Sequence, residues 1–234
     1  MGFSCRRYEA VLERIAEAAR KSGRLPGEVE LVSVTKTQPP EVLAEAIEGG
    51  VAILGENRVQ EAREKRSLLL PELASRARWH LIGSLQRNKA RQIPGLFDVV
   101  ESVDSLPLAK ELARRASAQS GEPLEVFIQV NMGNEPQKGG APLSEVPALL
   151  REIEGMPSLR AVGLMCIPPL GRAPEESRPH FRQLRELRDQ AIEAGHESVQ
   201  GLSMGMSADF EVAIEEGATS VRVGTAIFGH RTCV

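Results

Sequence analysis

Lys36 is the side chain of this 234-residue sequence that most directly suggests covalent chemistry. It follows the apolar run LVSVT, so its amine is expected at the end of a buried segment, where it loses part of its hydration. Loss of hydration disfavours the ammonium form of a lysine and frees the lone pair that attacks an aldehyde to form a Schiff base. A lysine at such a position can also extend its amine into solvent, so Lys36 alone does not decide between the two.

Two segments near the C-terminus combine glycine with hydroxyl side chains, as phosphate sites do. SMGMSAD contains Gly205 and Ser207, and RVGTAIFG contains Gly224 and Thr225. Glycine lets backbone N–H groups approach an anion without a Cβ atom in the way, and the hydroxyl groups add donors. We also expect Ser207 to be the N-cap of the helix that follows it. A reactive lysine opposite such a phosphate site indicates a phosphorylated aldehyde as the ligand.

Eight short apolar runs are predicted to be the strands that position these residues. Each is rich in β-branched residues and is followed by a segment of helical periodicity, which is typical of parallel strands covered by helices. The predicted strands span residues 30–36, 51–57, 79–85, 97–103, 124–131, 161–167, 198–205 and 219–225. The predicted helices span residues 4–22, 40–48, 58–69, 86–92, 105–119, 144–154, 175–194 and 207–216.

Eight strand–helix repeats predict an α/β fold, a single-domain (β/α)8 TIM barrel over residues 1–234, although a doubly wound open sheet has the same local pattern. Because little chain follows the last strand, we expect the N-terminal helix to cover the barrel where an eighth helix would lie. Functional groups of a barrel gather at the carboxyl ends of its strands. The polar or mouth-facing residues at those ends are Lys36, Asn57, His80, Ser84, Asn131, Met165, Ser203, Ser207, Arg222, Gly224 and Thr225.

The composition excludes several other classes of function. Lys and Arg number 29 against 32 Asp and Glu, and this net charge of −3 gives no electrostatic reason to bind nucleic acid or an anionic membrane. The three cysteines, Cys5, Cys166 and Cys233, are too far apart for a disulfide framework or a metal cluster. No apolar run approaches the length of a membrane span. We therefore expect a cytoplasmic protein, and a monomer because a closed barrel has no free edge.

Motifs in order along nearly the whole sequence resemble the pyridoxal phosphate (PLP) homeostasis protein family. The most specific are VSVTK, GEN, HLIG followed by LQ and NK, and SMGMSAD with RVGTAIFG. The resemblance implies a PLP barrel of fold type III, similar to the N-terminal domain of alanine racemases. It implies that PLP is joined covalently to Lys36, that Arg222 faces the pyridine nitrogen, that Ser207, Gly224 and Thr225 hold the phosphate, and that Asn57 and Met165 lie beside the ring. Ser203 is expected either near the phosphate or bonded to the backbone at its strand end.

The implied role of Arg222 also limits the chemistry. An arginine is a permanent cation without an acceptor, so it disfavours protonation of the pyridine nitrogen and leaves the ring a poor electron sink. Alanine racemases also use a tyrosine from an additional domain, whereas the one tyrosine here, Tyr8, falls on the inner face of the first helix. We therefore expect a protein that holds PLP and supplies or buffers it for apo-enzymes, with little or no catalysis.

Other functions stay open at this point. A slow PLP-dependent amino-acid racemase is the main alternative, and a Schiff-base aldolase acting on a phosphorylated sugar is another. A purely structural protein would not explain why a lysine and two phosphate-type loops converge at one end of a barrel. His80 is predicted to be a hydrogen-bonded residue of the core or the barrel mouth, and Cys166 a buried inert thiol. Lys138 is predicted to be solvated, with the further hypothesis that it offers a second amine to PLP in transit.

Overall fold

Eight parallel strands form a closed barrel in a computed structural model that describes residues 2–118, 121–133, 139–169 and 173–229. The strands are β1 (Glu30–Val34), β2 (Ile53–Glu56), β3 (Arg78–Leu81), β4 (Val99–Val103), β5 (Leu124–Val130), β6 (Leu159–Cys166), β7 (Gly201–Met206) and β8 (Ser220–Val223). Each strand pairs with the next in the sequence, and β8 pairs with β1 to close the barrel. The predicted (β/α)8 barrel is confirmed, and the open doubly wound sheet is wrong.

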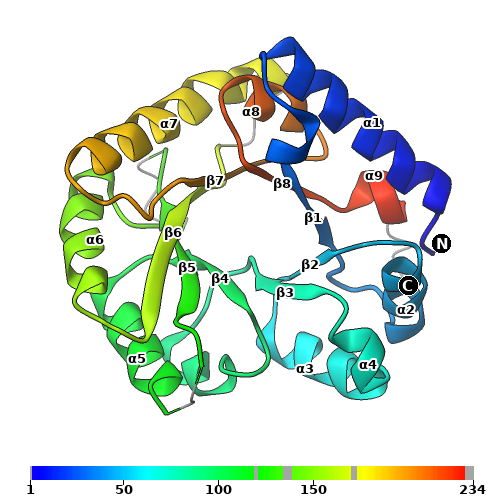
Figure 1. The fold of residues 1–234 in the computed structure, drawn as a ribbon, viewed down its shortest axis with the longest axis horizontal. Coiled ribbons are helices and arrows are strands. Elements are labelled where there is room, and N and C mark those ends of the chain that lie inside the picture. Colours follow the sequence, from blue (N-terminus) through cyan, green and yellow to red (C-terminus); the bar gives the residue numbers. More distant parts are fainter. Residues whose placement is uncertain (1, 119–120, 134–138, 170–172, 230–234) are drawn as a thin grey trace.

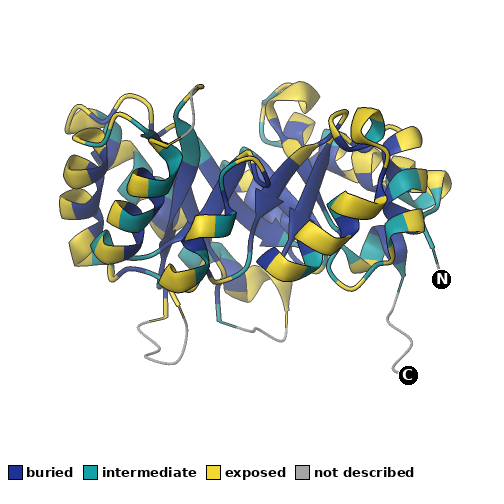
Figure 2. Ribbon diagram, turned by 90° about the horizontal axis from the view of Figure 1, so that it is seen from below, coloured by how far each residue is buried: buried dark blue, intermediate teal, exposed yellow. Residues whose placement is uncertain are grey.

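Helices surround the barrel as an outer ring (Figure 1). They are α1 (Cys5–Lys21), α2 (Pro40–Glu48), α3 (Val59–Leu68), α4 (Pro71–Ala74), α5 (Leu106–Ala116), α6 (Val146–Glu154), α7 (Arg178–Glu193), α8 (Phe210–Glu215) and α9 (Thr225–Phe228). Short 3-10 segments are η1 (Pro26–Glu28), η2 (Arg87–Gln92), η3 (Leu143–Glu145) and η4 (Pro174–Ser177). Figure 2 shows that the strands are buried while the helices expose their outer faces.

Three local predictions differ from the structure. The helix expected at 86–92 is the 3-10 segment η2, in which Ala90 is the buried residue. The helix expected at 207–216 begins later, at Phe210, with Asp209 in the N-cap position. The helices α4 and α9 were not predicted, because four residues are too few to show a helical period.

The N-terminal helix α1 covers the barrel beside its last strand. It packs against α8 and α9 through an apolar face that includes Val11 and Ile15 (Figure 1). Arg7 Nε donates a hydrogen bond of 2.7 Å to the carbonyl of Ile227 in α9. The helix ends at Lys21, and Gly23 beyond its C-cap has a φ of 73°, a left-handed conformation that glycine adopts without strain. The predicted place of this helix is confirmed.

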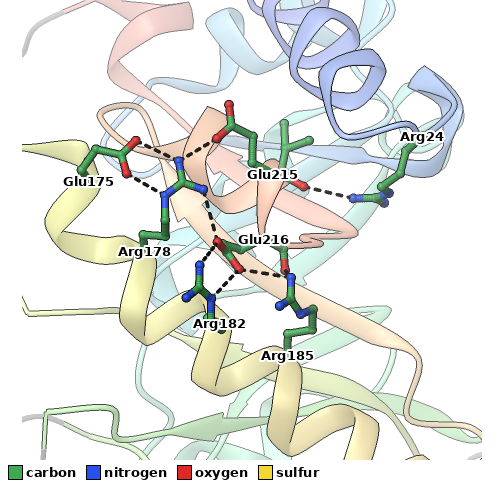
Figure 3. A network of polar contacts seen from close by, with 8 residues as sticks. Arg24, Glu175, Arg178, Arg182, Arg185, Glu215 and Glu216 are labelled. Atoms are coloured by element: carbon green, nitrogen blue, oxygen red, sulfur yellow. Dashed lines mark hydrogen bonds and ion pairs between the residues drawn. The ribbon is translucent and has the colours of Figure 1, made fainter.

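An ionic network on the outer surface joins α7 to the end of α8 (Figure 3). The carboxylate of Glu216 lies 3.2 Å from Arg178, 3.0 Å from Arg182 and 3.1 Å from Arg185. Arg178 also pairs with Glu215 at 2.6 Å. These contacts add to the buried side chains of Phe181, Leu184 and Ala191 in holding a highly charged helix against the barrel.

Candidate cofactor site

A cavity of about 410 Å³ opens at the carboxyl ends of the strands. Six of the eight predicted site residues line it: Lys36, Asn57, Ser207, Arg222, Gly224 and Thr225. Met165 and Ser203 do not. This is the end of a parallel barrel at which ligands bind, because the loops that follow the strands converge there.

Lys36 lies just after β1, at the point where the chain leaves the barrel. Its side chain is half-buried and lines the cavity. The pairing between β1 and β2 extends to Thr35, whose N–H donates to the carbonyl of Gly55 at 3.0 Å. Thr37 then has φ 65°, a left-handed conformation that is uncommon for a β-branched residue. Lys36 is therefore held between an ordered strand end and a sharp turn.

Arg222 projects from β8 into the barrel and is 4% exposed. Its Nη1 donates to the hydroxyl of Ser203 at 2.5 Å, and its Nη2 donates to the carbonyl of Cys166 at 2.7 Å. The hydroxyl of Ser203 donates in turn to Glu101 Oε2 at 2.6 Å. Ser203 was expected near the phosphate or bonded to the backbone. Its hydroxyl instead links Arg222 to the buried carboxylate of Glu101, outside the cavity lining.

Glu101 is the residue of this region that sequence reasoning missed. Its Oε1 lies 2.7 Å from Nδ1 of His80, and its Oε2 lies 4.0 Å from Arg222. Burial alone would raise the pKa of Glu101, but the hydrogen bond and charge of His80, with Arg222 and Ser203, hold this pKa below its ordinary value. Glu101 is therefore a carboxylate that balances the charge of Arg222. Its one signal in the sequence was an acidic residue inside the apolar run FDVVESV.

His80 is a hydrogen-bonded residue of the barrel interior, as predicted. Its Nδ1 pairs with Glu101, whereas its Nε2 is buried and has no hydrogen-bond partner among the described residues. A single bonded nitrogen is enough to orient the ring, and the ring in turn orients the carboxylate. His80 supports the site from below, because it does not line the cavity.

Met165 and Cys166 are both buried at the end of β6. Met165 packs inside the barrel against Val99 and Phe127. The thiol of Cys166 is surrounded by protein, and this burial raises its pKa to about 12, with the charge of Arg222 opposing the shift. A thiol with so high a pKa forms little thiolate and is a poor nucleophile. The prediction of an inert buried thiol agrees with this environment.

The loops after β7 and β8 meet at one side of the cavity. The N–H of Gly224 donates a long hydrogen bond of 3.4 Å to the hydroxyl of Ser207. A Cβ atom at Gly224 would lie 3.1 Å from the carbonyl oxygen of Val34, so this position has little room for a side chain. Thr225 adds a second hydroxyl to the same wall. Two hydroxyl groups and a glycine backbone are therefore brought together, as the sequence predicted.

Two roles assigned to these loops are wrong. Ser207 is not the N-cap of α8, because the helix begins at Phe210 and Asp209 occupies the N-cap position. Asp209 instead accepts from the N–H of Met206 at 2.7 Å, which shapes the loop. Gly205 lies outside the cavity lining, and a Cβ atom there would meet α8, 2.6 Å from the Cβ of Ala213. Its glycine is needed for packing rather than for an anion.

The opposite wall is formed by the loops after β2 and β3. Asn57 and Gly83 line the cavity together, and a Cβ atom at Gly83 would lie 2.2 Å from the carbonyl oxygen of Asn57. Ser84 and Gln129 complete this wall. Gln129 was not predicted, because it lies inside an apolar strand rather than at its end. Lys138 lies outside the described residues.

A second cavity, of about 390 Å³, lies at the amino ends of the strands. Its two arginines are already paired, since Arg78 and Arg160 each lie 2.6 Å from the carboxylate of Glu125. Across the described ranges, no three His, Cys, Asp or Glu side chains are placed to hold a metal ion. No helix in the same ranges has the length and apolar character to cross a bilayer.

Sequence comparison relates this chain to proteins of one kind over nearly its full length. The family model for the alanine racemase N-terminal domain matches residues 8–232. A pyridoxal phosphate homeostasis protein from Aquifex aeolicus is 43% identical over 228 residues, which cover 97% of this chain and 98% of that protein. The pyridoxal phosphate homeostasis protein of Pseudomonas aeruginosa is 42% identical and covers 94% of this chain and 93% of its own length.

Solved structures agree with this relationship. PipY of Synechococcus elongatus, solved with PLP bound, has a TM-score of 0.79 and 37% identity, covering 92% of this chain and all of that one. A protein of unknown function from Bifidobacterium adolescentis has a TM-score of 0.89 and 36% identity, covering 96% and 94% of the two chains. Alanine racemase from Corynebacterium glutamicum, at 16% identity and a TM-score of 0.64, shares the fold over 97% of this chain and 62% of its own.

Proposed function

The chain belongs to the pyridoxal phosphate homeostasis protein family, and from this premise we propose that it holds PLP on Lys36 and supplies or buffers the cofactor for apo-enzymes. The observation that carries the proposal is the convergence of three kinds of group on one cavity. Lys36 brings a primary amine, Arg222 a cation, and Ser207 with Thr225 two hydroxyl donors. Each of these suits a different part of PLP.

The residues present fit PLP by their chemistry. When bound, PLP supplies an aldehyde that forms a Schiff base with a primary amine and a ring that withdraws electrons. Lys36 lies at the rim of β1, while Ser207, Gly224 and Thr225 form the wall built by β7 and β8. Gly224 lies so close to Val34 that little room is left for a side chain. Because glycine has none, no side chain stands between its backbone and an anion in the cavity. Arg222 is fixed by Ser203 and Cys166, so it presents its charge in one direction.

The same residues support a carrier rather than an efficient enzyme. Arg222 donates hydrogen bonds and accepts none, so it favours an unprotonated ring nitrogen and weakens the electron sink that carbanion chemistry needs. Tyr8, the one tyrosine in the sequence, lies on α1 and donates to the carbonyl of Gly50 at 3.3 Å. Gly50 precedes β2, at the amino end of the barrel, so Tyr8 cannot serve as an acid–base group in the cavity.

The visible spectrum of the purified protein tests the proposal. We expect PLP to produce an absorbance band that is lost in Lys36→Ala, and borohydride reduction to leave a PLP adduct that peptide mapping places on Lys36. Lys21→Ala, which removes an exposed lysine of α1 outside the cavity, serves as the matched control and should keep the band. A protein that stays colourless after incubation with excess PLP would exclude the function.

Isotope exchange separates the carrier from the slow racemase that is its alternative. If the protein is a carrier, a panel of α-deuterated amino acids should exchange deuterium with water at the background rate in its presence. If it is a racemase, at least one of these amino acids should exchange faster. An aldolase would instead be trapped by borohydride only with a sugar phosphate.

We also propose that the protein is a cytoplasmic monomer. Light scattering during gel filtration measures its mass in solution.

A further inference from the structure

A buried ion cluster lies beneath the rim of the cavity, between α3 and the end of β1. Lys65 of α3 is 5% exposed, and its ammonium group reaches three acceptors. These are the carbonyl of Thr35 at 2.7 Å, Glu56 Oε1 at 2.8 Å and Glu61 Oε1 at 2.6 Å. An ammonium group has three donors, so this geometry uses all of them. A cluster so fully bonded fixes the groups that it touches.

The groups it touches include both chain neighbours of Lys36. On one side, Lys65 binds the carbonyl of Thr35, and the hydroxyl of Thr35 donates to Glu56 Oε1 at 2.6 Å. On the other side, the N–H of Thr37 donates to Glu61 Oε1. The backbone is therefore held immediately before and immediately after Lys36. The cluster does not line the cavity itself.

The contact from Glu61 secures an unfavourable backbone conformation. Thr37 is exposed and has φ 65°, and it is the one non-glycine residue with positive φ in the described part of the chain. A β-branched residue avoids this conformation unless its surroundings impose it. Without the carboxylate of Glu61, the N–H of Thr37 would lose its partner and the turn would relax. The direction of the Lys36 side chain depends on that turn, because Lys36 immediately precedes it.

We propose that Glu56, Lys65 and Glu61 form a positioning unit that clasps the backbone on both sides of Lys36 and aims its amine at an aldehyde in the cavity. This rests on the proposed function. In the assisted step, the neutral amine nitrogen adds to the aldehyde carbon, a C=N bond replaces the C=O bond, and the oxygen leaves as water with the two amine protons. The cluster contributes geometry to this step and exchanges no atom with the ligand.

Two ligands distinguish an effect on the position of the Lys36 amine from an effect on ligand binding in the cavity. PLP reports Schiff-base formation through its visible band, while pyridoxine 5′-phosphate, which carries an alcohol in place of the aldehyde, reports noncovalent binding. In Glu61→Ala and Lys65→Met we expect the rate constant for appearance of the band to fall about tenfold or more, because small misplacements of a reacting group are costly. The dissociation constant for pyridoxine 5′-phosphate should stay within about twofold of the parent value, since the cavity lining is unaltered.

A rescue variant and a matched control make the test specific. Asparagine adopts the left-handed conformation more readily than threonine, so Thr37→Asn added to Glu61→Ala should restore most of the lost rate. Glu216→Gln removes a carboxylate bonded to three arginines on the outer surface and should leave the rate unchanged. If Lys65→Met does not fold, Glu61→Ala decides alone, because Glu61 is only partly buried.

Three results would overturn the positioning role. Unchanged band formation in Glu61→Ala would mean that the cluster is structural only, and so would a lost rate that Thr37→Asn does not recover. An equal loss of affinity for both ligands would mean that the cluster shapes the whole cavity. A parent protein that binds pyridoxine 5′-phosphate but forms no band with PLP would instead exclude the proposed function, and with it this role.

Discussion

Two buried carboxylates, Glu216 in the outer layer of helices and Glu101 inside the barrel, are held in opposite ways. Glu216 contacts three arginines, of which Arg182 exposes 53% of its side chain (Figure 3). Glu101 is fully enclosed and contacts His80, Ser203 and, at 4.0 Å, one arginine. Burial would raise the pKa of both groups, and in both the polar partners lower it further than burial raises it.

The two networks differ in what the loss of one partner would do. Around Glu216, whose three arginine partners are partly exposed, water and the remaining arginines compensate for a missing side chain, so each single ion pair contributes little. In the interior, a missing partner leaves a charge with neither water nor a counter-ion, which is strongly destabilising. The three arginines on Glu216 are therefore redundant contacts that attach α7 to the barrel. The single contacts of Glu101, which hold Arg222 in its direction, have no replacement.

The sharpest test of this difference is Glu101→Ala. It leaves the guanidinium of Arg222 buried without a counter-charge, and we expect the free energy of unfolding to fall by about 3–5 kcal/mol. Urea denaturation of the PLP-free protein measures this change. A loss below about 1 kcal/mol, the size expected of a surface ion pair, would show that the interior network is as replaceable as the outer one.

Gly83→Ala tests whether the cavity wall is as sensitive to an added Cβ atom as the interior is to the loss of a charged partner. The new Cβ atom would lie 2.2 Å from the carbonyl oxygen of Asn57, so backbone must move. We expect a loss of about 1–3 kcal/mol in unfolding free energy. Gly27→Ala is the matched control, because its Cβ atom would have no neighbour within 4 Å and its stability should be nearly unchanged. Equal effects of the two would contradict the packing argument.

Glu216→Gln should have the smallest effect of the three. Because the three arginines that surround Glu216 are partly exposed, we expect this substitution to lower the free energy of unfolding by about 1 kcal/mol or less in dilute salt, and by less still at high salt, which screens these charges. The folded-state pKa of Glu216 lies below its ordinary value of 4.5. Its stabilisation is therefore complete above that value and is lost as the pH falls through the lower, folded-state pKa.

The difference in stability between the parent and Glu216→Gln measures this dependence directly. It should be constant near neutral pH and shrink as acid is added below 4.5, because the parent then loses its carboxylate. Measuring a difference removes the contributions of other acids, including Glu56, whose pKa is raised by burial despite its contact with Lys65. A difference that grew towards acid pH would reverse the assigned sign.

The barrel was predictable because its signals are local. Each strand is a short apolar run, and each end residue, such as Lys36 or Arg222, can be recognised from the run before it. The partners of those residues were not predictable, since Ser203 and Glu101 are 102 positions apart and nothing in the sequence pairs them. The buried position of Lys65 was not predictable for a different reason. Lys65 lies in the charged helix α3, and the periodicity of that helix does not distinguish a buried lysine from a solvated one.

The hydrogen bond between Arg7 and Ile227 spans 220 residues of sequence. During synthesis, α1 and β1 leave the ribosome long before β8 and α9, the elements that they contact. Contacts so distant in sequence form late and slow the folding of a chain. The nascent protein therefore has an incomplete barrel for most of its translation, and the residues from Arg222 to Thr225 complete the site in the same event that closes the ring.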